Sequence, residues 1–162
     1  MIKAVKSIQG VTNVPLQIDS TIPEVLEAAL RVYNGKPMVN SVNGEEESLK
    51  NVLPLVKKYG AAVVGLTLDK DGIPPKAEQR VAIAEKIIKR CEEIGIPKED
   101  IAIDCLTLTA SAEQLAVNET LKAVRAVKER FGVRTVLGVS NISFGLPNRE
   151  LCLLYTSDAA DE

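Results

Sequence analysis

The stretch that decides the fold of this chain is residues 135–147, TVLGVSNISFGLP. Its first half is apolar and β-branched, with Thr135, Val136 and Val139, and it stops abruptly at Ser140 and Asn141. Such an apolar run predicts a buried strand, and the glycine and proline that follow predict a tight strand-to-helix turn. A strand with a polar end, followed by a helix, is therefore the unit to look for elsewhere in the sequence.

Four earlier segments repeat this unit. Each is a short apolar run that closes with Asp or Asn ahead of a helical pattern: residues 16–20 (LQIDS), 37–41 (PMVNS), 63–69 (VVGLTLD) and 101–104 (IAID). The polar side chains at the carboxyl ends of the predicted strands are Asp19, Asn40, Asp69, Asp104 and Asn141. In parallel α/β folds, ligands bind at the carboxyl ends of the strands, so these positions mark the candidate site.

Helical patterns separate the predicted strands. Residues 1–9 carry one apolar helical face and resemble the tail of a longer helix. Helix starts are predicted at Thr21, Asn43, Pro75 and Ser111. Helix ends are predicted at Gly35, Gly60, Gly95 and Gly132. In the last of these helices, the residues expected to face inward are Leu121, Val124, Val127 and Phe131.

The order of strands and helices indicates the topology. Strands joined by helices of this length pair in parallel through right-handed crossovers. The 162 residues contain five such β/α units, whereas a closed (β/α)8 TIM barrel needs eight strands and about 250 residues. We therefore expect an α/β domain over residues 1–151 that is an incomplete part of a barrel.

The last residues depart from this pattern. Residues 152–162, CLLYTSDAADE, break the helical face indicated by Leu146, Arg149 and Leu151, and they resemble a translated sequencing adaptor. We therefore expect a non-native tail and a genuine sequence that ends near Leu151, with a natural acidic tail as the alternative.

The composition argues against several classes of partner. The net charge of −2 gives no electrostatic reason to expect nucleic acid or an anionic membrane, and an aromatic content of 3% leaves few platforms for stacking bases. No apolar run approaches the roughly 18 residues of a membrane span, and no basic leader precedes an apolar segment. We therefore expect a cytoplasmic protein.

Histidine and cysteine usage narrows the chemistry further. The chain has no histidine, which excludes Ser-His-Asp and Cys-His catalysis. Cys91, Cys105 and Cys152 are far apart and form no C-x-x-C motif, so we expect no bound metal. The site chemistry must therefore come from carboxylates, amides and hydroxyls.

Two carboxylates and two amides at one edge of a sheet can bind a neutral heterocycle. An inward-facing carboxylate such as Asp19 or Asp104 accepts two parallel hydrogen bonds from a planar edge of N–H and NH₂ groups. An asparagine such as Asn40 or Asn141 offers an acceptor and two donors and can bind a mixed edge. The alternative is that each residue only caps the following helix. That alternative is weaker for the four together, because neighbouring Ser, Thr and Asn residues already supply caps.

Five segments of the chain resemble one known family. PLQIDS, KPMVNSVN, GAAVVGLTLDKDGIP, DIAIDCLTLT and TVLGVSNISFGLPNREL are similar to the pterin-binding domain of methyltetrahydrofolate-dependent corrinoid methyltransferases. This family includes the folate module of cobalamin-dependent methionine synthase and the methyltransferase that serves a corrinoid iron–sulfur protein. The resemblance covers about residues 3–151 and implies a TIM barrel whose first and last strands are missing here.

The resemblance implies roles for individual residues. The family positions that fall on Asp19, Asn40 and Asp104 hold the pterin ring, with the acids pairing with its amino and ring N–H donors. The position of Asn141 approaches N5, the atom that bears the methyl group, so Asn141 is the candidate catalytic residue. Asp69 and Ser143 would line the mouth of the site more loosely. Many relatives have proline where this chain has Cys105, which can change the loop but not the carboxylate before it.

The implied reaction is transfer of the methyl group from N5 of methyltetrahydrofolate to the Co(I) of a corrinoid. A partner domain or protein docked over the barrel mouth would carry the corrinoid (cobalamin). Asn141 would stabilise the N5-protonated folate by hydrogen bonding as charge develops. The sequence leaves open whether the parent is methionine synthase or a free-standing methyltransferase, and it is compatible with a homodimer.

Three other interpretations stay open. One is a non-catalytic folate-binding module, although a pure binder need not address N5 as Asn141 does. The second is a dihydropteroate synthase, which shares the barrel and part of the acid and amide set, although nothing here resembles its glycine-rich loop with a lysine. The third is a fragment that does not fold alone, because five parallel strands leave two open edges and an uncovered apolar layer.

Overall fold

A computed structural model describes residues 1–112 and 115–151. The expected tail, 152–162, lies outside the described residues. The strands are β1 (Gln17–Asp19), β2 (Met38–Val42), β3 (Ala62–Leu66), β4 (Ile101–Asp104) and β5 (Arg134–Val136). The α-helices are α1 (Ile2–Gln9), α2 (Pro23–Val32), α3 (Glu46–Tyr59), α4 (Ala77–Ile94) and α5 (Ala116–Phe131). Two short 3-10 helices are η1 (Lys98–Asp100) and η2 (Val139–Ser143).

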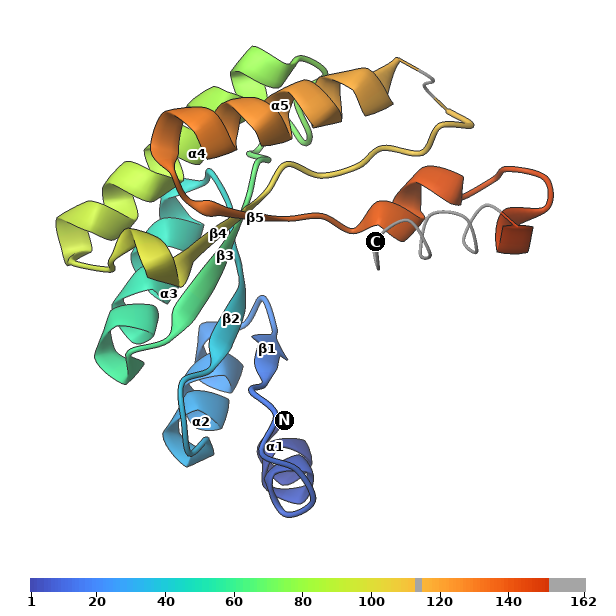
Figure 1. Cartoon of the computed structure of the whole chain (residues 1–162). Coiled ribbons are helices and arrows are strands. Elements are labelled where there is room, and N and C mark those ends of the chain that lie inside the picture. The colour runs from blue at the N-terminus through green and yellow to red at the C-terminus, as the bar shows by residue number, and fades with distance from the viewer. Residues whose placement is uncertain (113–114, 152–162) are drawn as a thin grey trace.

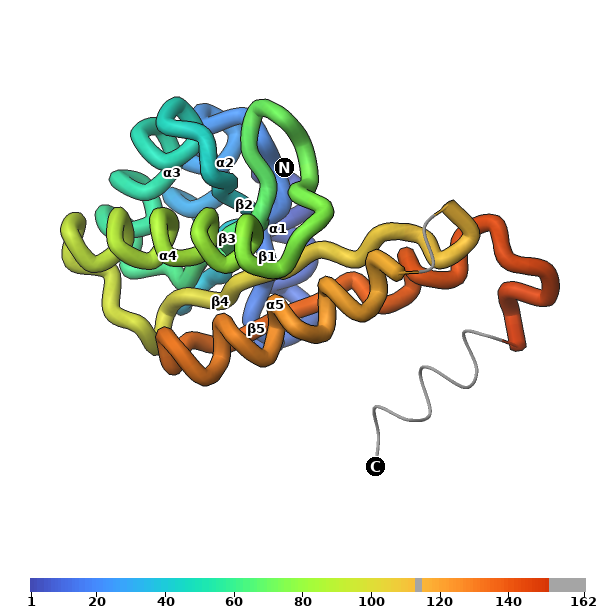
Figure 2. The backbone as a smooth tube through the Cα atoms, turned by 90° about the horizontal axis from the view of Figure 1, so that it is seen from above, coloured from blue at the N-terminus to red at the C-terminus, as the bar shows by residue number. Residues whose placement is uncertain are grey.

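The five strands form one parallel sheet in the order β1-β2-β3-β4-β5. Helices α2 to α5 cover one face of this sheet and leave the other face open, as in part of a barrel wall (Figure 1). The view from above shows the same curved layer of helices outside the strands (Figure 2). The predicted β/α order, parallel pairing and partial barrel are therefore confirmed.

The hydrophobic core lies between the sheet and its helices. One face of the sheet contributes Ile18, Val39, Val63, Ile101 and Ile103, each at most 2% exposed, and the helices pack against them. Gly65 in β3 allows α4 to approach closely, because a Cβ there would lie 2.9 Å from Cγ2 of Ile87 and 3.0 Å from Cδ1 of Ile103. The close packing of α4 on the sheet therefore requires a glycine at position 65 as well as the apolar side chains around it.

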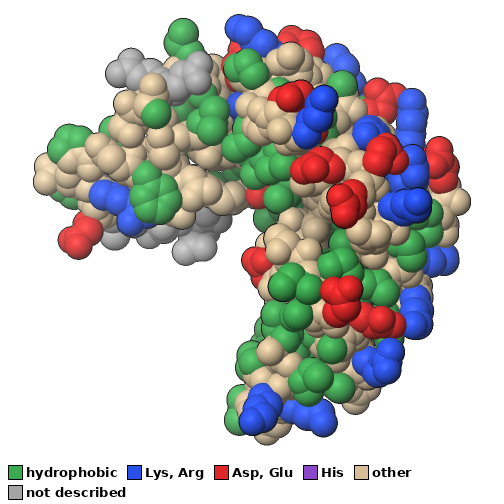
Figure 3. All heavy atoms as spheres, turned by 180° about the vertical axis from the view of Figure 1, so that it is seen from behind, with side chains coloured by type: hydrophobic (Ala, Val, Ile, Leu, Met, Phe, Trp, Pro, Cys, Tyr) green, Lys and Arg blue, Asp and Glu red, His purple; other side chains and the backbone are tan. Residues whose placement is uncertain are grey.

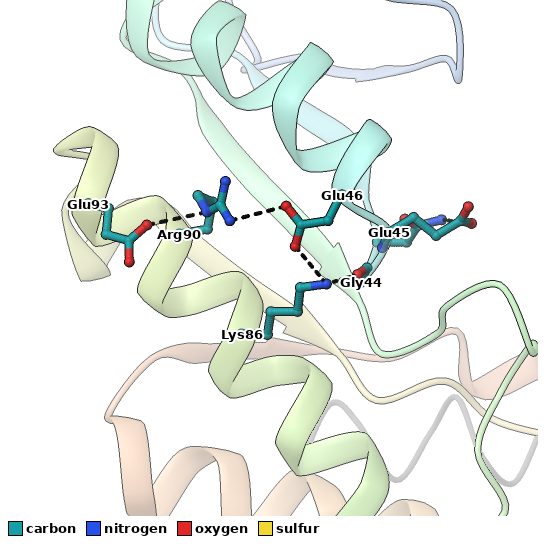
Figure 4. Close-up of polar contacts among 7 residues, drawn as sticks. Gly44, Glu45, Glu46, Lys86, Arg90 and Glu93 are labelled. Atoms are coloured by element: carbon teal, nitrogen blue, oxygen red, sulfur yellow. Dashed lines mark hydrogen bonds and ion pairs between the residues drawn. The ribbon is translucent and has the colours of Figure 1, made fainter.

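Exposed ion pairs join α3 and α4 on the outer surface (Figure 4). The Nζ atom of Lys86 lies 2.9 Å from Oε1 of Glu46 and donates to the Gly44 carbonyl at 2.7 Å. Arg90 reaches the other Glu46 oxygen at 3.1 Å and Glu93 at 3.3 Å. These contacts hold the start of α3 against the middle of α4, directly beside the loop that follows β2.

Two predicted helix starts are wrong. Helix α2 begins at Pro23 after Ile22 and has no side-chain cap, so the predicted cap, Thr21, is wrong; the Ile22 N–H donates to the Ser20 hydroxyl at 3.2 Å. Ser111 does not cap α5, because its hydroxyl donates to the carbonyl of Phe144 at 2.7 Å and α5 begins only at residue 116. The hydroxyls of Ser20 and Ser111, which could cap a helix, instead form hydrogen bonds with backbone groups outside the helices.

The loop before α3 is closer to the prediction. The Asn43 side chain accepts a hydrogen bond from the Glu45 N–H at 2.9 Å immediately before the helix. In α5, by contrast, Leu121 is 59% exposed although it was expected to face inward. The buried face of α5 instead carries Ala116, Thr120, Ala123 and Val127, which are small enough to let α5 lie close to α4.

The ends of β3 and β5 also differ from expectation. The predicted strand 63–69 stops at Leu66, because the chain turns back between Asp69 and Gly72 through two mutual backbone hydrogen bonds. β5 was expected to be buried, but Val136 is 41% exposed because it lies opposite Asp104, on the face of the sheet that no helix covers, in an edge strand. The space-filling view from behind shows the molecule hollowed, with hydrophobic side chains along the wall of the hollow (Figure 3).

None of the described helices is long and apolar enough to cross a membrane.

Candidate functional site

The strand register places three of the predicted site residues on one face of the sheet. Asp19 lies opposite Asn40, and Asn40 lies opposite Val64. Val64 in turn lies opposite Ala102, two residues before Asp104 in β4. Because side chains two apart on a strand share a face, Asp19, Asn40 and Asp104 all lie on the face opposite the helices. This is the open, concave side of the barrel wall, at the carboxyl ends of the strands.

Asp19 and Asn40 form a direct pair. The Nδ2 atom of Asn40 donates to Oδ2 of Asp19 at 3.2 Å, and Ser20 N–H continues the strand ladder by donating to the Asn40 carbonyl at 3.0 Å. The peptide bond between Asn40 and Ser41 is cis. The pair leaves the other Asp19 oxygen and the Asn40 amide oxygen as acceptors that face the open side. Together they can accept N–H donors from one planar ligand edge.

Asp104 is half-buried at the end of β4. Its Oδ1 atom accepts a hydrogen bond of 2.7 Å from the Leu106 N–H. Burial raises the pKa of Asp104 above the ordinary value of an aspartate, and the Leu106 hydrogen bond opposes part of that rise. A carboxylate that burial has partly stripped of water gains more than an exposed one from N–H donors on a ligand.

Asn141 is not brought into contact with these three residues. It is exposed and lies in η2, five residues beyond the end of β5. The segment from β5 through η2 continues past the sheet in both views (Figures 1 and 2). The Ala110 N–H donates to the Ile142 carbonyl at 3.0 Å, so this segment is tied to the loop that follows β4 and not to β1 or β2.

The two more peripheral residues make local hydrogen bonds. The Asp69 carboxylate accepts from the Asp71 N–H at 3.0 Å and stabilises the turn after β3. The Ser143 hydroxyl is 1% exposed and donates to the Ser140 carbonyl at 2.9 Å within η2. Both side chains thus have structural partners, and a role at the mouth of the site stays a prediction.

Arg80 in α4 is fully buried and was not predicted from the sequence as a site residue. Its Nη1 atom donates to the carbonyls of Cys105 and Leu106, at 3.1 and 3.0 Å, immediately after Asp104. A signal was present in the sequence: Arg80 shares a helical stripe with Ala84, Ile87 and Cys91, all of them buried. A cation on an apolar stripe must find buried partners, and here they are the backbone beside a site residue.

Arg149 is a second cation that the sequence analysis did not single out. Its guanidinium carbon lies 4.1 Å from the centre of the Phe144 ring, within the distance of a cation–π contact. Both residues follow η2, so this contact stabilises the fold of the segment that presents Asn141.

Cys91 and Cys105, the cysteines within the described residues, are not nucleophiles in this fold. Burial raises the pKa of Cys91 and Cys105 to about 12, so both thiols stay protonated at neutral pH. Within residues 1–112 and 115–151, no group of three or more His, Cys, Asp or Glu side chains is placed to hold a metal ion. The described site offers hydrogen-bond acceptors and donors for a flat, donor-rich ligand.

Comparison with known proteins identifies the family of this chain. The sequence matches the family described as pterin binding enzyme over residues 1–157. The chain belongs to this family. It is 40% identical over 147 residues to methionine synthase from Mycobacterium leprae (strain TN). The matched region covers 84% of this chain and 12% of the methionine synthase. It is also 30% identical over 147 residues to methylcorrinoid:tetrahydrofolate methyltransferase from Eubacterium limosum, and this match covers 89% of this chain and 54% of the methyltransferase.

The chain therefore spans about half or less of the curated relatives it matches. Among solved structures, it is similar to dihydropteroate synthase from Yersinia pestis, with a TM-score of 0.68 and 14% identity over 96% of this chain and 60% of that one. It is also similar to dihydropteroate synthase from Stenotrophomonas maltophilia, with a TM-score of 0.64 and 21% identity over 85% of this chain and 52% of that one. At these identities the likeness shows the fold alone, and that fold agrees with the partial barrel. The predicted family resemblance is confirmed.

Proposed function

We propose that this chain is the pterin-binding part of a methyltransferase that moves the N5 methyl group of methyltetrahydrofolate to the Co(I) of a corrinoid. The corrinoid is a substrate carried by a partner domain or protein that docks over the mouth of the barrel. The observation that carries the proposal is the placement of Asp19, Asn40 and Asp104 on one open face. The name of the Eubacterium limosum relative pairs a methylcorrinoid with tetrahydrofolate, which supports methyl exchange between a folate and a corrinoid, and the direction of transfer is part of the proposal.

The chain's own residues would bind and orient the pterin ring. Asp104 and Asp19 accept hydrogen bonds from the amino and ring N–H groups, and Asn40 binds an adjacent mixed donor and acceptor position. The Asn40 to Asp19 hydrogen bond of 3.2 Å fixes the rotamers of both side chains before the ligand arrives. Such preorganisation places the methyl group for an in-line transfer without ordering the side chains during the reaction.

Asn141 would act on the reacting nitrogen. A tertiary amine is a poor leaving group, and a proton on N5 lets the bonding electron pair remain on nitrogen when the methyl group leaves. The side-chain oxygen of Asn141 stabilises that protonated state by accepting the N5–H, an interaction that strengthens as N5 acquires the positive charge of the proton. This role requires η2 to lie over the bound pterin, and the Ala110 to Ile142 hydrogen bond ties η2 to the rim beside Asp104.

The test uses a completed barrel, in which residues 1–151 replace the matching part of the Eubacterium limosum methyltransferase so that eight strands can close. This protein is mixed with methyltetrahydrofolate and Co(I) cobalamin, and a single turnover is followed by the loss of the Co(I) absorbance. We expect a loss that depends on methyltetrahydrofolate and slows when Asp104 is replaced by Asn. Pterin binding with no methyl transfer would instead support a non-catalytic folate-binding module.

A further inference from the structure

Arg80 connects three segments around the end of β4. Its Nε atom donates to the Pro74 carbonyl at 2.7 Å, in the loop before α4. Its Nη1 atom lies 2.8 Å from the hydroxyl of Thr120 in α5 and also reaches the carbonyls of Cys105 and Leu106. Arg80 and Thr120 are at most 2% exposed. This buried network is therefore built into the core between α4, α5 and the loop that follows Asp104.

Leu106 is held in an unusual backbone conformation by these contacts. Its φ is +60°, in the left-handed region that non-glycine residues rarely adopt. Its carbonyl lies 3.0 Å from both Arg80 Nη1 and the Thr120 hydroxyl. In this conformation its N–H points back to the Asp104 carboxylate at 2.7 Å. Surrounding structure that fixes such a conformation commonly serves a nearby site.

We propose that Arg80 and Thr120 are positioning residues for Asp104: they clamp the Leu106 carbonyl, and the Leu106 N–H then orients the Asp104 carboxylate toward the ligand. The inference deepens the proposed function, since it rests on Asp104 as a pterin-binding residue. The planar fork of an arginine suits the task, because it can reach Pro74 and the two carbonyls after β4 at once. The single ammonium of a lysine cannot span these partners.

The direction in which the pKa of Asp104 shifts in variants of Arg80 or Thr120 separates this positioning role from a merely structural one. Losing the Leu106 hydrogen bond removes a group that lowers the pKa of Asp104, so that pKa should rise further. A general loosening of the core would admit water to the carboxylate and lower the pKa toward its ordinary value. The two roles therefore predict shifts of opposite sign.

The experiment titrates the Asp104 carboxyl carbon by NMR in the completed barrel labelled with ¹³C-aspartate, beside the amide signal of Leu106. The variants are Arg80→Met and Thr120→Val, and Thr120→Val keeps the buried charge of Arg80. Thr120→Ser retains the hydroxyl, and Val127→Ala creates a cavity in the same helix without touching Leu106. We expect a raised Asp104 pKa and a shifted Leu106 amide in Arg80→Met and Thr120→Val but in neither control.

An unchanged or lowered Asp104 pKa in Thr120→Val would overturn the inference, and this variant decides the test if Arg80→Met does not fold. Calorimetry on the same proteins should show methyltetrahydrofolate affinity weakened by about threefold to tenfold in Thr120→Val, the effect of disturbing one hydrogen bond. Wild-type affinity that survives Thr120→Val unchanged would also overturn it. A completed barrel with wild-type residues 1–151 that binds no folate would contradict the proposed function, whereas the titration would still decide the positioning role.

Discussion

Replacing Asp104 by Asn should weaken folate binding while stabilising the protein. The two side chains have nearly the same shape, and the asparagine oxygen can still accept the Leu106 N–H that Asp104 accepts at 2.7 Å. The substitution therefore keeps the loop intact. It changes the second oxygen into an NH₂ group that faces the N–H donors of the pterin.

The magnitude follows from a charged hydrogen bond replaced by two facing donors. Such a change costs about 2–3 kcal/mol, or roughly 30- to 150-fold in the dissociation constant. Stability should change in the other direction, because burial raises the pKa of Asp104 and thus disfavours its ionised form in the folded state. A carboxyl with a raised pKa stabilises the fold below its unfolded pKa and loses that contribution as the pH rises through its folded pKa. The uncharged asparagine avoids this loss at pH 7.

The assay measures methyltetrahydrofolate binding by titration calorimetry and the melting temperature by scanning calorimetry, both in the completed barrel. At pH 7, Asp104→Asn should bind weakly and melt higher than wild type, and the difference in melting temperature should shrink as the pH approaches about 4. Asp71→Asn, an exposed aspartate in the β3–α4 loop, should change neither quantity. Unchanged affinity together with a lower melting temperature at pH 7 would refute the reasoning.

Three further predictions concern other parts of the chain. In the completed barrel, Asn141→Ala should slow single-turnover methyl transfer by roughly 10²- to 10³-fold and weaken folate binding by less, whereas full activity in Asn141→Gly would mean that Asn141 is only a turn residue. Gly65→Ala should lower the free energy of unfolding by about 1–3 kcal/mol in a denaturant titration, because its Cβ would lie 2.9 Å from Ile87, and an unchanged midpoint would show that α4 can move. The 162-residue chain should self-associate through its two open strand edges, and size-exclusion chromatography that gives a monodisperse monomer with a cooperative melt would contradict this.

The sequence predicted what depends on local pattern. Asp19 and Asp104 lie at the ends of β1 and β4 as predicted, because a short apolar run with a polar end sets both the strand and the face of its last side chain. The predicted strand end at Asn40 is wrong, since β2 continues to Val42. The parallel order followed from the helices between the strands. The register then brought these residues onto one face, since Asp19 and Asn40 lie opposite each other and Asp104 lies an even number of residues, two, beyond their level in β4.

What the sequence could not predict depends on neighbours distant in the chain. The apolar run of β3 continues through Leu68, so the pattern does not reveal that the turn at Asp69 ends the strand at Leu66. The exposure of Val136 and Leu121 depends on which strands and helices lie beside β5 and α5, and no local pattern contains that information. Arg80 was visible as a cation on an apolar stripe, but its partners include the Cys105 carbonyl, 25 residues further on, and the Thr120 hydroxyl, 40 residues further on in α5.

The central claim is that Asp19, Asn40 and Asp104 together hold a pterin ring. A crystal structure of the completed barrel with bound methyltetrahydrofolate measures this directly. We expect the pterin amino and ring N–H groups to lie about 2.7–3.2 Å from the carboxylate oxygens of Asp104 and Asp19, with the Asn40 side chain on the same ring edge. A pterin bound elsewhere, with these three side chains solvated and out of contact, would contradict the claim.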